Sequence, residues 1–392
     1  MKILVICQYY YPEPFRITDV CEELVKLGHN VTVVTGTPNY PMGNIYSGYE
    51  NRSRQDEVIN GVKVHRCVVH PRKNGTVHRL WNYYSYSCAS SRYIKRLDAS
   101  FDVVFINQLS PVMMANAGIK YARKHKKKSV LYCLDLWPAS LGAGGINSGP
   151  VYKFFHKVSR RIYRAVDKVL VSSKSFSRYF EDEFKIYNTD YFPQYAESLF
   201  TVEECKKPPN EYIDLMFAGN VGAAQKVDTI IRAAARCKDV ENLRWHIVGD
   251  GKEIDSCKKL ASELNAPVIF HGRKPIEEMP KYYAMADAML VTMQNDPIIS
   301  LTLPGKVQSY MAAGKFVIAT DRGELSAVVK ECDCGLCCDT DDPEAFASCV
   351  KNFIEMNSKA KCDMENNSYS AYIEKFSKSK FMDCLVEEFC TS

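Results

Sequence analysis

The sequence has no apolar run that approaches the roughly 18 residues needed to cross a bilayer. Its first residues, MKILVICQ, resemble the start of a signal peptide. However, Gln8 and a group of tyrosines follow where a small-residue cleavage site is expected. A buried first strand explains this segment better. These absences predict a chain that stays in the cytosol, where contact with the inner face of the membrane is still open to it.

A large charge excess is lacking too. The formal net charge is only +5, and no pattern of basic and aromatic residues typical of a nucleic-acid-binding module occurs. We therefore expect no nucleic-acid partner. A chain of 392 residues, with 46% hydrophobic and 25% charged residues, is typical of a folded protein that is too long for a single core. The totals predict two domains.

Metal sites have little support in the sequence. The one Asp-x-Asp pattern, Asp339-Thr340-Asp341, runs directly into Asp342-Pro343, and Asp341-Asp342-Pro343 is more typical of a helix start than of a metal site. Most of the sixteen cysteines are scattered, as small buried hydrophobes in a reducing compartment would be. The dense cluster from Cys332 to Cys338 loosely resembles a thiolate site, but it has no second ligand pair at matching spacing. A helix end followed by Gly335 and a short strand is the preferred interpretation, and we expect neither metal nor cofactor.

Strand-like and helix-like patterns alternate along almost the whole chain. The strands expected in the first half are Lys2–Cys7, Val31–Thr35, Val62–Val69, Asp102–Asn107, Ser129–Leu134 and Lys168–Ser172. Those expected in the second half are Ile213–Phe217, Trp245–Val248, Val268–Phe270, Ala288–Thr292 and Phe316–Ala319. Ile17–Leu27 repeats apolar residues at helical spacing, and Gly28 stands where that helix should stop. Continuous apolar strands joined by helices predict parallel sheets covered on both faces.

The polar segment Thr201–Tyr212, with its Pro-Pro pair, interrupts this alternation. The predicted fold class is therefore α/β, with two Rossmann-like, doubly wound parallel-sheet domains facing each other across a cleft. We place the first domain at residues 1–200, the linker at 201–212 and the second domain at 213–365. A helical tail at 366–392 is expected to pack back on the first domain. Ligands of such sheets bind outside the carboxyl ends of the strands.

The loops at those strand ends differ between the halves. Gln8–Pro14 follows the first strand and is no G-x-G-x-x-G, which argues against a dinucleotide there and suits an acceptor with rings and a carboxylate better. The second half instead has Ala218–Gly222 before a helix, where amides favour an anion. Since a helix dipole contributes only about 0.3–1 kcal/mol, a diphosphate also needs a cation, and Lys226 and Lys306 are the candidates. A tight turn with a surface lysine is the alternative.

Leu303–Ile318, LPGKVQSYMAAGKFVI, carries the most specific pattern. It resembles a helix of the retaining glycosyltransferases of family 4, which has the form P-(S/G)-K-x-x-E-Y-M-A-x-G-K-P-V-I and lies in the second domain of a GT-B fold. Other segments similar to that family are Tyr10–Pro14 with Arg16, Leu27–Thr35, Pro38–Pro41, Asp135–Pro138, Gly219–Gly222, Val248–Gly251 and His271–Arg273. The resemblance spans nearly the whole chain. It is closest to the branch that builds bacterial capsule, O-antigen or colanic-acid-type polysaccharides.

The resemblance implies a role for each matching residue. The diphosphate would be held by Gly219, Asn220, Val221, Gly222 and Lys226, with Lys306 as the second cation. Gly272 and Arg273 would border the nucleobase. The donor sugar would meet backbone N–H groups of the segment from Ile298 through Ile299, Ser300, Leu301, Thr302 and Leu303. The acceptor would be faced by Tyr11, Glu13, Arg16, Asn39 and Asp135. The catalytic candidates are Asp135, Glu13, Lys226 and Lys306.

Two positions depart from the family pattern. Ser309 stands where the family usually has a glutamate that binds the ribose hydroxyls, and a hydroxyl makes a weaker neutral contact. An upstream glutamate common in the family is also missing, and Asn295-Asp296-Pro297 occupies that region. Recognition of the donor's hydroxyl groups is therefore the open part of the prediction, together with the identity of the donor sugar.

The resemblance further implies retention of anomeric configuration, no obligatory metal and a UDP-sugar donor. The implied acceptor is a saccharide on a polyprenyl diphosphate at the cytoplasmic membrane. Two basic stretches, Lys120–Lys128 and Tyr152–Val169, and the aromatic stretch Leu80–Tyr93 fit contact with anionic lipids, although solvated helix faces would look similar. Two other functions are alternatives for this architecture: a nucleotide-sugar epimerase and a two-lobed protein that only binds a small ligand.

Overall fold

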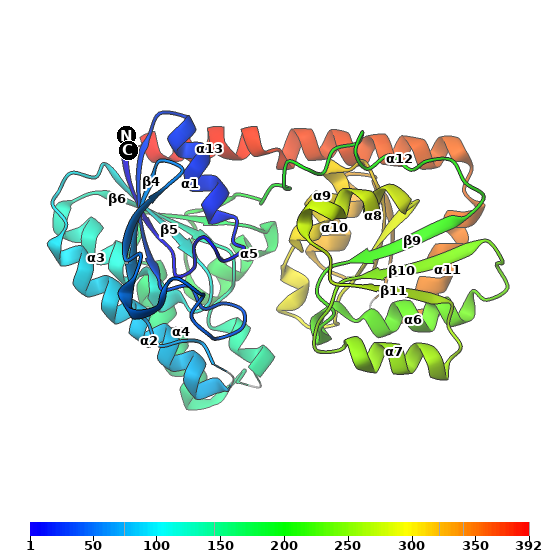
Figure 1. The fold of residues 1–392 in the computed structure, drawn as a ribbon, viewed down its shortest axis with the longest axis horizontal. Helices are drawn as coiled ribbons and strands as arrows, with labels where there is room; N and C mark the ends of the chain where they lie inside the picture. Colours follow the sequence, from blue (N-terminus) through cyan, green and yellow to red (C-terminus); the bar gives the residue numbers. More distant parts are fainter. Residues whose placement is uncertain (74, 145, 321, 340, 392) are drawn as a thin grey trace. The chain divides into compact units, whose positions relative to one another are not determined.

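The computed structural model describes residues 1–73, 75–144, 146–320, 322–339 and 341–391. The chain forms two compact units (Figure 1). The first consists of Met1–Ser172, Phe176–Phe192 and Met382–Ser392, and the second of Ser173–Ser175 and Pro193–Phe381.

The first unit is built on a sheet with the strand order β3-β4-β2-β1-β5-β6-β7-β8. Its strands are β1 (Lys2–Ile6), β2 (Asn30–Gly36), β3 (Asp56–Ile59), β4 (Val62–Cys67), β5 (Val103–Gln108), β6 (Lys128–Cys133), β7 (Lys168–Val171) and β8 (Thr189–Tyr191). The pairs run parallel, except that β3 is antiparallel to β4. In β1 the side chains from Ile3 to Ile6 are fully buried, as expected for a central strand covered on both faces.

Helices cover both faces of this sheet. They are α1 (Ile17–Lys26), α2 (Thr76–Tyr93), α3 (Asn116–His125), α4 (Gly149–Tyr163) and α5 (Lys174–Tyr179), and α13 (Lys378–Cys390) returns at the end of the chain. Figure 1 shows α1 and α3 on opposite sides of the strands. Gly28 follows α1 with φ +85°, a left-handed conformation that glycine adopts readily, so the predicted helix stop is confirmed. The chain ends lie together, since Cys390 Sγ is 3.9 Å from Met1 Sδ (Figure 1).

The second unit has a fully parallel sheet with the order β11-β10-β9-β12-β13-β14. Its strands are β9 (Ile213–Ala218), β10 (Leu243–Val248), β11 (Val268–Gly272), β12 (Ala288–Thr292), β13 (Phe316–Thr320) and β14 (Gly335–Cys338). Its helices are α6 (Val227–Arg236), α7 (Ile254–Glu263), α8 (Met279–Met285), α9 (Gly305–Ala312), α10 (Glu324–Glu331), α11 (Pro343–Glu355) and α12 (Ser358–Ala371).

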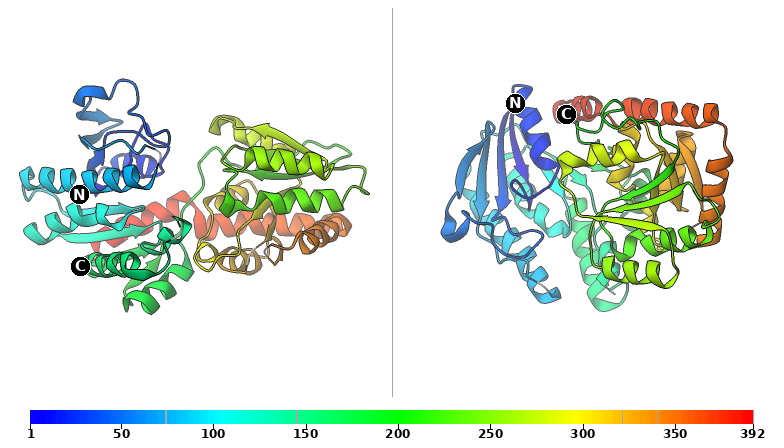
Figure 2. Two further views of the ribbon diagram at one scale, coloured as in Figure 1. Left: turned by 90° about the horizontal axis from the view of Figure 1, so that it is seen from below. Right: turned by 45° about the vertical axis from the view of Figure 1, so that its right-hand side comes forward.

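One face of the second sheet packs against α6, α7 and α11 around Phe217, Trp245 and Phe346, which are all fully buried. In Figure 1, α6 and α7 lie below the strands and α8, α9 and α10 above them, and Figure 2 shows helices flanking this sheet in two further views. The predicted class, two parallel-sheet α/β domains, is confirmed. In the cysteine-rich region, α10 ends at Glu331 and β14 begins at Gly335.

The boundary between the units lies earlier than residue 200. Pro193–Phe200 belongs to the second unit because its aromatic side chains pack there: Phe200 stacks on Tyr283, with ring centroids 4.6 Å apart. The tail also divides differently from the prediction. The α12 helix stays with the second unit, where Ser368 donates a hydrogen bond to the carbonyl of Lys315, and only the segment from Met382 onward belongs to the first.

Two short strands, β3 and β8, were not predicted. They carry the polar sequences DEVI and TDY at the edges of the first sheet, and polar edge strands resemble loops in sequence.

Within the part of the chain that the structure describes, no helix is both long and apolar enough to span a membrane.

Candidate functional site

Three glycine turns meet at the carboxyl edge of the second sheet. Gly219 directly follows β9, Gly249 directly follows β10, and Gly272 is the last residue of β11. Backbone hydrogen bonds join them: the Gly219 amide donates to Val248 (2.9 Å) and the Gly249 amide to Gly272 (2.9 Å). The predicted donor residues Gly219–Gly222 and Gly272 therefore lie at one edge, where ligands of doubly wound sheets bind.

Close backbone packing explains the glycines of these turns. Gly219 and Gly249 have φ angles of +141° and +144°, which residues with side chains rarely adopt. A Cβ atom on Gly249 would lie 1.8 Å from the carbonyl oxygen of Gly219. The Val221 amide donates to Asp250 (3.0 Å), so the amides of Gly219 and Val221 are both bound to backbone carbonyls. The other amides of the predicted diphosphate turn belong to Asn220 and Gly222.

Lys306 places its ammonium group directly beside the first glycine turn. Its Nζ lies 3.8 Å from the ring centroid of Phe217 and 2.7 Å from the position that a Cβ on Gly219 would take. Although the stem is partly exposed, the nitrogen is covered and makes no hydrogen bond to any of the described residues. Burial lowers the pKa of Lys306 to about 7. A buried ammonium without a hydrogen-bond partner interacts favourably with an anion that reaches it.

Tyr310 fixes the position of Lys306. It lies one turn further along α9, and its hydroxyl donates to the carbonyl of Ala218 (3.0 Å) and accepts from the Ala218 amide (3.2 Å). Ala218 is the last residue of β9 and directly precedes Gly219. Because residues four apart share a face of a helix, this bond holds the ammonium of Lys306 at the glycine turn.

The second predicted cation, Lys226, has a different environment. It precedes α6 in a left-handed conformation (φ +43°), and its Nζ forms ion pairs with Asp228 (3.2 Å) and Asp341 (3.5 Å). Burial opposes its charge, but the two carboxylates outweigh burial and raise the pKa of Lys226. Lys226 and Gly222 line a cavity of about 550 Å³ beside α6 and α7. Lys226 would have to exchange its carboxylate partners for a phosphate.

The predicted donor-sugar segment includes a short 3-10 helix, Ile299–Leu301, and leads into α9 through Thr302 and the buried Leu303. The Ser300 carbonyl packs so closely on Gly323 that a Cβ there would lie 2.0 Å from it. The Ser173 hydroxyl donates to the carbonyl of Leu301 (2.5 Å). The carbonyls of Ser300 and Leu301 are therefore fixed by their contacts with Gly323 and Ser173, and these contacts set the orientation of the adjoining peptide groups.

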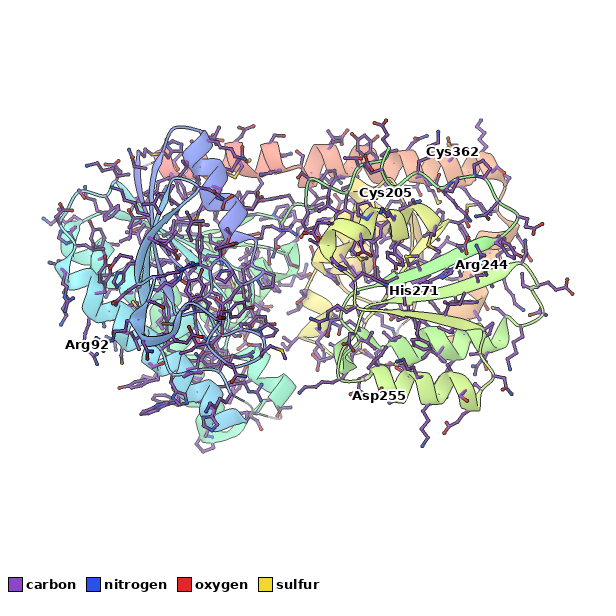
Figure 3. The ribbon with its side chains drawn as sticks, viewed as in Figure 1. Arg92, Cys205, Arg244, Asp255, His271 and Cys362 are labelled. Carbon is purple, nitrogen blue, oxygen red and sulfur yellow. The ribbon has the colours of Figure 1, made fainter. Side chains whose placement is uncertain are left out.

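At the predicted nucleobase border, Gly272 is left-handed (φ +69°) and Arg273 is exposed. The preceding residue, His271, belongs to a buried polar network. His246 joins His271 (2.9 Å) to the buried carboxylate of Asp214 (2.9 Å), which also pairs with Arg244. Figure 3 shows Arg244 and His271 on β10 and β11. Burial, and then the neighbouring His246, lower the pKa of His271. The network fixes the strand end that carries Gly272.

In the first unit, Glu13 is buried, and its carboxylate accepts hydrogen bonds from backbone amides of the protein. One carboxylate oxygen accepts from the amides of Asn39 (2.8 Å) and Tyr40 (2.7 Å), and the other from Tyr10 (3.3 Å). Burial raises the pKa of Glu13 to about 7. The side chain of Asn39 is also engaged, because its oxygen accepts from the Arg72 amide (2.8 Å). Both predicted acceptor residues hold together the loops after β1 and β2, and a direct contact with an acceptor stays a prediction for them.

Asp135 follows β6, at the same carboxyl edge as Glu13. It accepts a hydrogen bond from the hydroxyl of Ser110, which also lies 3.0 Å from Ser140 Oγ. Burial raises the pKa of Asp135. Of the other predicted acceptor residues, Tyr11 is half exposed and Arg16 is partly buried at the start of α1.

Two residues of the second unit were missed by the sequence interpretation. Tyr310 lies inside the specific segment but was not singled out, although its helical spacing from Lys306 gave a signal. Glu197, which contacts Ser309, gave no signal because it lies 112 residues away in the sequence.

The described ranges contain no cluster of three or more His, Cys, Asp or Glu residues that could hold a metal ion.

Comparison with known families assigns both units. Residues 15–191 match the model described as Glycosyl transferase 4-like domain, and residues 213–356 match the model described as Glycosyl transferases group 1. The "Putative colanic acid biosynthesis glycosyl transferase WcaI" of Escherichia coli (strain K12) is 26% identical over 344 residues, which cover 82% of this chain and 83% of that protein.

Solved structures show the same fold. Sucrose-phosphate synthase (tll1590) from Thermosynechococcus elongatus superposes with a TM-score of 0.77 at 15% identity, over 99% of this chain and 98% of that one. Alr3699/HepE of Anabaena, solved in complex with UDP, gives a TM-score of 0.74 at 13% identity, over 99% of both chains. The protein is therefore a glycosyltransferase of the GT-B fold, composed of a glycosyl transferase 4-like domain followed by a group 1 glycosyl transferase domain.

Proposed function

We propose that this enzyme transfers a sugar from a UDP-sugar to a lipid-linked saccharide during bacterial cell-surface polysaccharide synthesis, with retention of anomeric configuration. The main support for a nucleotide-sugar donor is the buried ammonium of Lys306 beside Gly219. The name of WcaI, a relative in colanic acid biosynthesis, supports the pathway class, and the UDP bound by HepE supports the nucleotide.

The chemistry follows from where charge develops. As the bond from the anomeric carbon to the diphosphate breaks, negative charge grows on the departing oxygen. A fixed cation aimed at that oxygen stabilises the transition state more than the ground state. We assign this role to Lys306, with the amides of Asn220 and Gly222 completing the anion contact. Lys226 is a second cation that becomes available when the diphosphate displaces Asp228 or Asp341.

The acceptor hydroxyl must lose its proton during transfer. Asp135 is the proposed group, because its pKa is raised by burial and a nearby carboxylate with a raised pKa is a competent proton acceptor. Glu13 is a positioning residue in this proposal, since its oxygens hold the amides of Tyr10, Asn39 and Tyr40. Tyr11 and Arg16 stay candidates for contact with the acceptor.

A nucleotide-release assay tests the proposal. With a UDP-sugar and a polyprenyl-diphosphate saccharide together, UDP should be released at a rate that depends on both substrates. The product should keep the anomeric configuration of the donor, which NMR spectroscopy reads directly. Conversion of the donor sugar without net UDP release would instead support the epimerase, and binding without turnover the two-lobed binding protein; either result would contradict the proposal.

A lipid-linked acceptor requires contact with a membrane surface, and α4 offers one. Its exposed face carries Phe154, which is 62% exposed, together with Lys153, Lys157, Arg160 and Arg161. On the opposite face Ile162 and Tyr163 are buried, and the Tyr163 hydroxyl donates to Gln108 Oε1 at the end of β5 (3.3 Å). An exposed aromatic flanked by cations is typical of helices that lie in the interface of anionic bilayers. Arg164 is not part of this surface, because it donates to the carbonyl of Phe184 (3.0 Å).

The double change Arg160→Gln/Arg161→Gln is expected to weaken binding to phosphatidylserine-containing vesicles roughly 30-fold, because each cation near an anionic surface contributes about 1 kcal/mol. Flotation of the protein with vesicles measures this directly. The matched control is Lys258→Gln/Lys259→Gln, which removes the same charge from the exposed face of α7 in the second unit, outside the basic stretches that fit lipid contact. Equal losses in both variants would mean that net charge alone governs binding and that α4 is not the contact.

A further inference from the structure

A carboxylate lies against Ser309, one helical turn along α9 from Lys306. Oε2 of Glu197 accepts a hydrogen bond from Ser309 Oγ at 3.3 Å. Ser309 lies on α9 and is 5% exposed, whereas Glu197 is half-buried in the segment that opens the second unit. The pair therefore joins two parts of the same unit that are distant in sequence.

Aromatic packing holds Glu197 in this place. On its N-terminal side, Tyr195 meets Phe381 edge to face, with ring centroids 4.8 Å apart. On its C-terminal side, Phe200 stacks on Tyr283 at 4.6 Å, and Tyr283 meets Tyr310 of α9 at 5.4 Å. Because both flanks of Glu197 are fixed to the second unit, the position of its carboxylate relative to α9 is set by the fold.

The pair lies one helical turn from the proposed diphosphate site. Lys306 and Ser309 are three residues apart on α9, so their Cβ atoms are about 5–6 Å apart on one face of the helix. The ammonium of Lys306 contacts the turn at Gly219. A ligand whose diphosphate reaches Lys306 therefore brings its neighbouring group to Glu197 and Ser309.

Charge decides what that neighbouring group is. A carboxylate repels a diphosphate, so the part of the ligand at Glu197 must be neutral and must donate hydrogen bonds. A nucleoside diphosphate carries ribose next to its phosphates, and a carboxylate accepts well from ribose hydroxyls. The proposed donor-sugar segment, Ile299–Leu301, leads into α9 before Lys306, whereas Ser309 lies one helical turn after it. We therefore assign the sugar and the ribose to opposite sides of the diphosphate.

We propose that Glu197, together with the hydroxyl of Ser309, binds the ribose hydroxyls of the donor nucleotide and makes the enzyme select ribonucleotides over deoxyribonucleotides. This inference rests on the proposed function. It assigns ribose recognition to a residue outside the helix that carries Lys306.

Calorimetric titration with UDP and 2′-deoxy-UDP tests the assignment. The wild-type protein should bind UDP about tenfold or more tightly than 2′-deoxy-UDP, the effect of one hydrogen bond to a charged group. Glu197→Gln should lose most of this preference by weakening UDP binding, with 2′-deoxy-UDP affinity nearly unchanged. The matched control, Glu203→Gln, removes an exposed carboxylate that also lies between residue 193 and β9, and it should keep the wild-type preference.

A second variant separates recognition from folding. In Glu197→Gln/Ser309→Glu a carboxylate is supplied from α9 itself, and the preference for UDP should return while the melting temperature reports intact folding. If Glu197→Gln weakens both nucleotides equally, or if the wild-type protein does not distinguish them, the inference is overturned while the proposed function stands. If neither nucleotide binds the wild-type protein at millimolar concentration, both fall.

Discussion

Lys306→Met should lower the rate of sugar transfer about 10²–10³-fold, the usual cost of removing one preorganised group that stabilises developing negative charge. The same change should raise the melting temperature of the protein alone. The Lys306 ammonium is buried beside Phe217, and burial lowers its pKa to about 7 from 10.5. Burying the charged ammonium therefore lowers the free energy of unfolding by its full amount below pH 7, and this loss of stability disappears as the pH rises toward 10.5. Methionine has a similar length and carries no charge.

Steady-state kinetics and thermal unfolding at pH 7 measure both effects, and an increase of a few degrees corresponds to roughly 1 kcal/mol for domains of this size. Lys226→Met is the matched control. It also removes a lysine near the glycine turn, but it leaves Asp228 and Asp341 without their ion-pair partner, so it should not stabilise the protein. Near-normal turnover in Lys306→Met would contradict the role of Lys306 in sugar transfer. A lowered melting temperature would contradict the claim that its buried charge destabilises the fold.

Nucleoside diphosphate affinity should fall by up to about tenfold per pH unit as the pH rises from 7 to 9. The direction follows from Lys306: its ammonium loses its proton above a pKa of about 7, whereas a bound diphosphate favours the charged form. Binding at pH 8 must therefore take up close to one proton. The phosphates contribute little to this uptake, since a terminal phosphate with a second pKa of about 6 is already deprotonated.

Calorimetry at pH 8 in two buffers with different ionisation enthalpies measures the number of protons taken up. The wild-type protein should take up nearly one proton on binding UDP, and Lys306→Met nearly none. Equal uptake in both proteins would assign the linkage to another group, and Glu13 is the alternative with a pKa near 7. Glu13→Gln in the same experiment distinguishes these two sources.

Much of the fold could be predicted because the central strands consist of continuous apolar runs. Ala288–Thr292 was predicted with the bounds that the structure gives β12, and Gly28 marked the end of α1. The polar edge strands β3 and β8 could not be predicted, since their sequences lack both an apolar run and an alternating pattern. Segment 193–200 was placed in the first domain because its packing partners, Tyr283 and Phe381, are distant in sequence.

The donor site was predicted in its components but not in its contacts. The glycine turn and Lys306 were identified from local patterns, because close backbone approach and anion binding require particular residue types at particular positions. One of the two ion pairs of Lys226 is with Asp341, which lies more than a hundred residues away, and the contact of Glu197 with Ser309 spans a similar separation. Such contacts are set by tertiary packing, and a single sequence carries no signal for them.

The most direct test of the account is the pKa of the Lys306 ammonium, measured by ¹⁵N NMR titration of selectively labelled protein with and without UDP. We predict a pKa of about 7 in the protein alone and an increase of at least about two units when UDP is bound, as the uptake of nearly one proton at pH 8 requires. An ordinary lysine pKa in the protein alone, or a pKa that does not change when UDP binds, would contradict the placement of the diphosphate at Gly219 and Lys306.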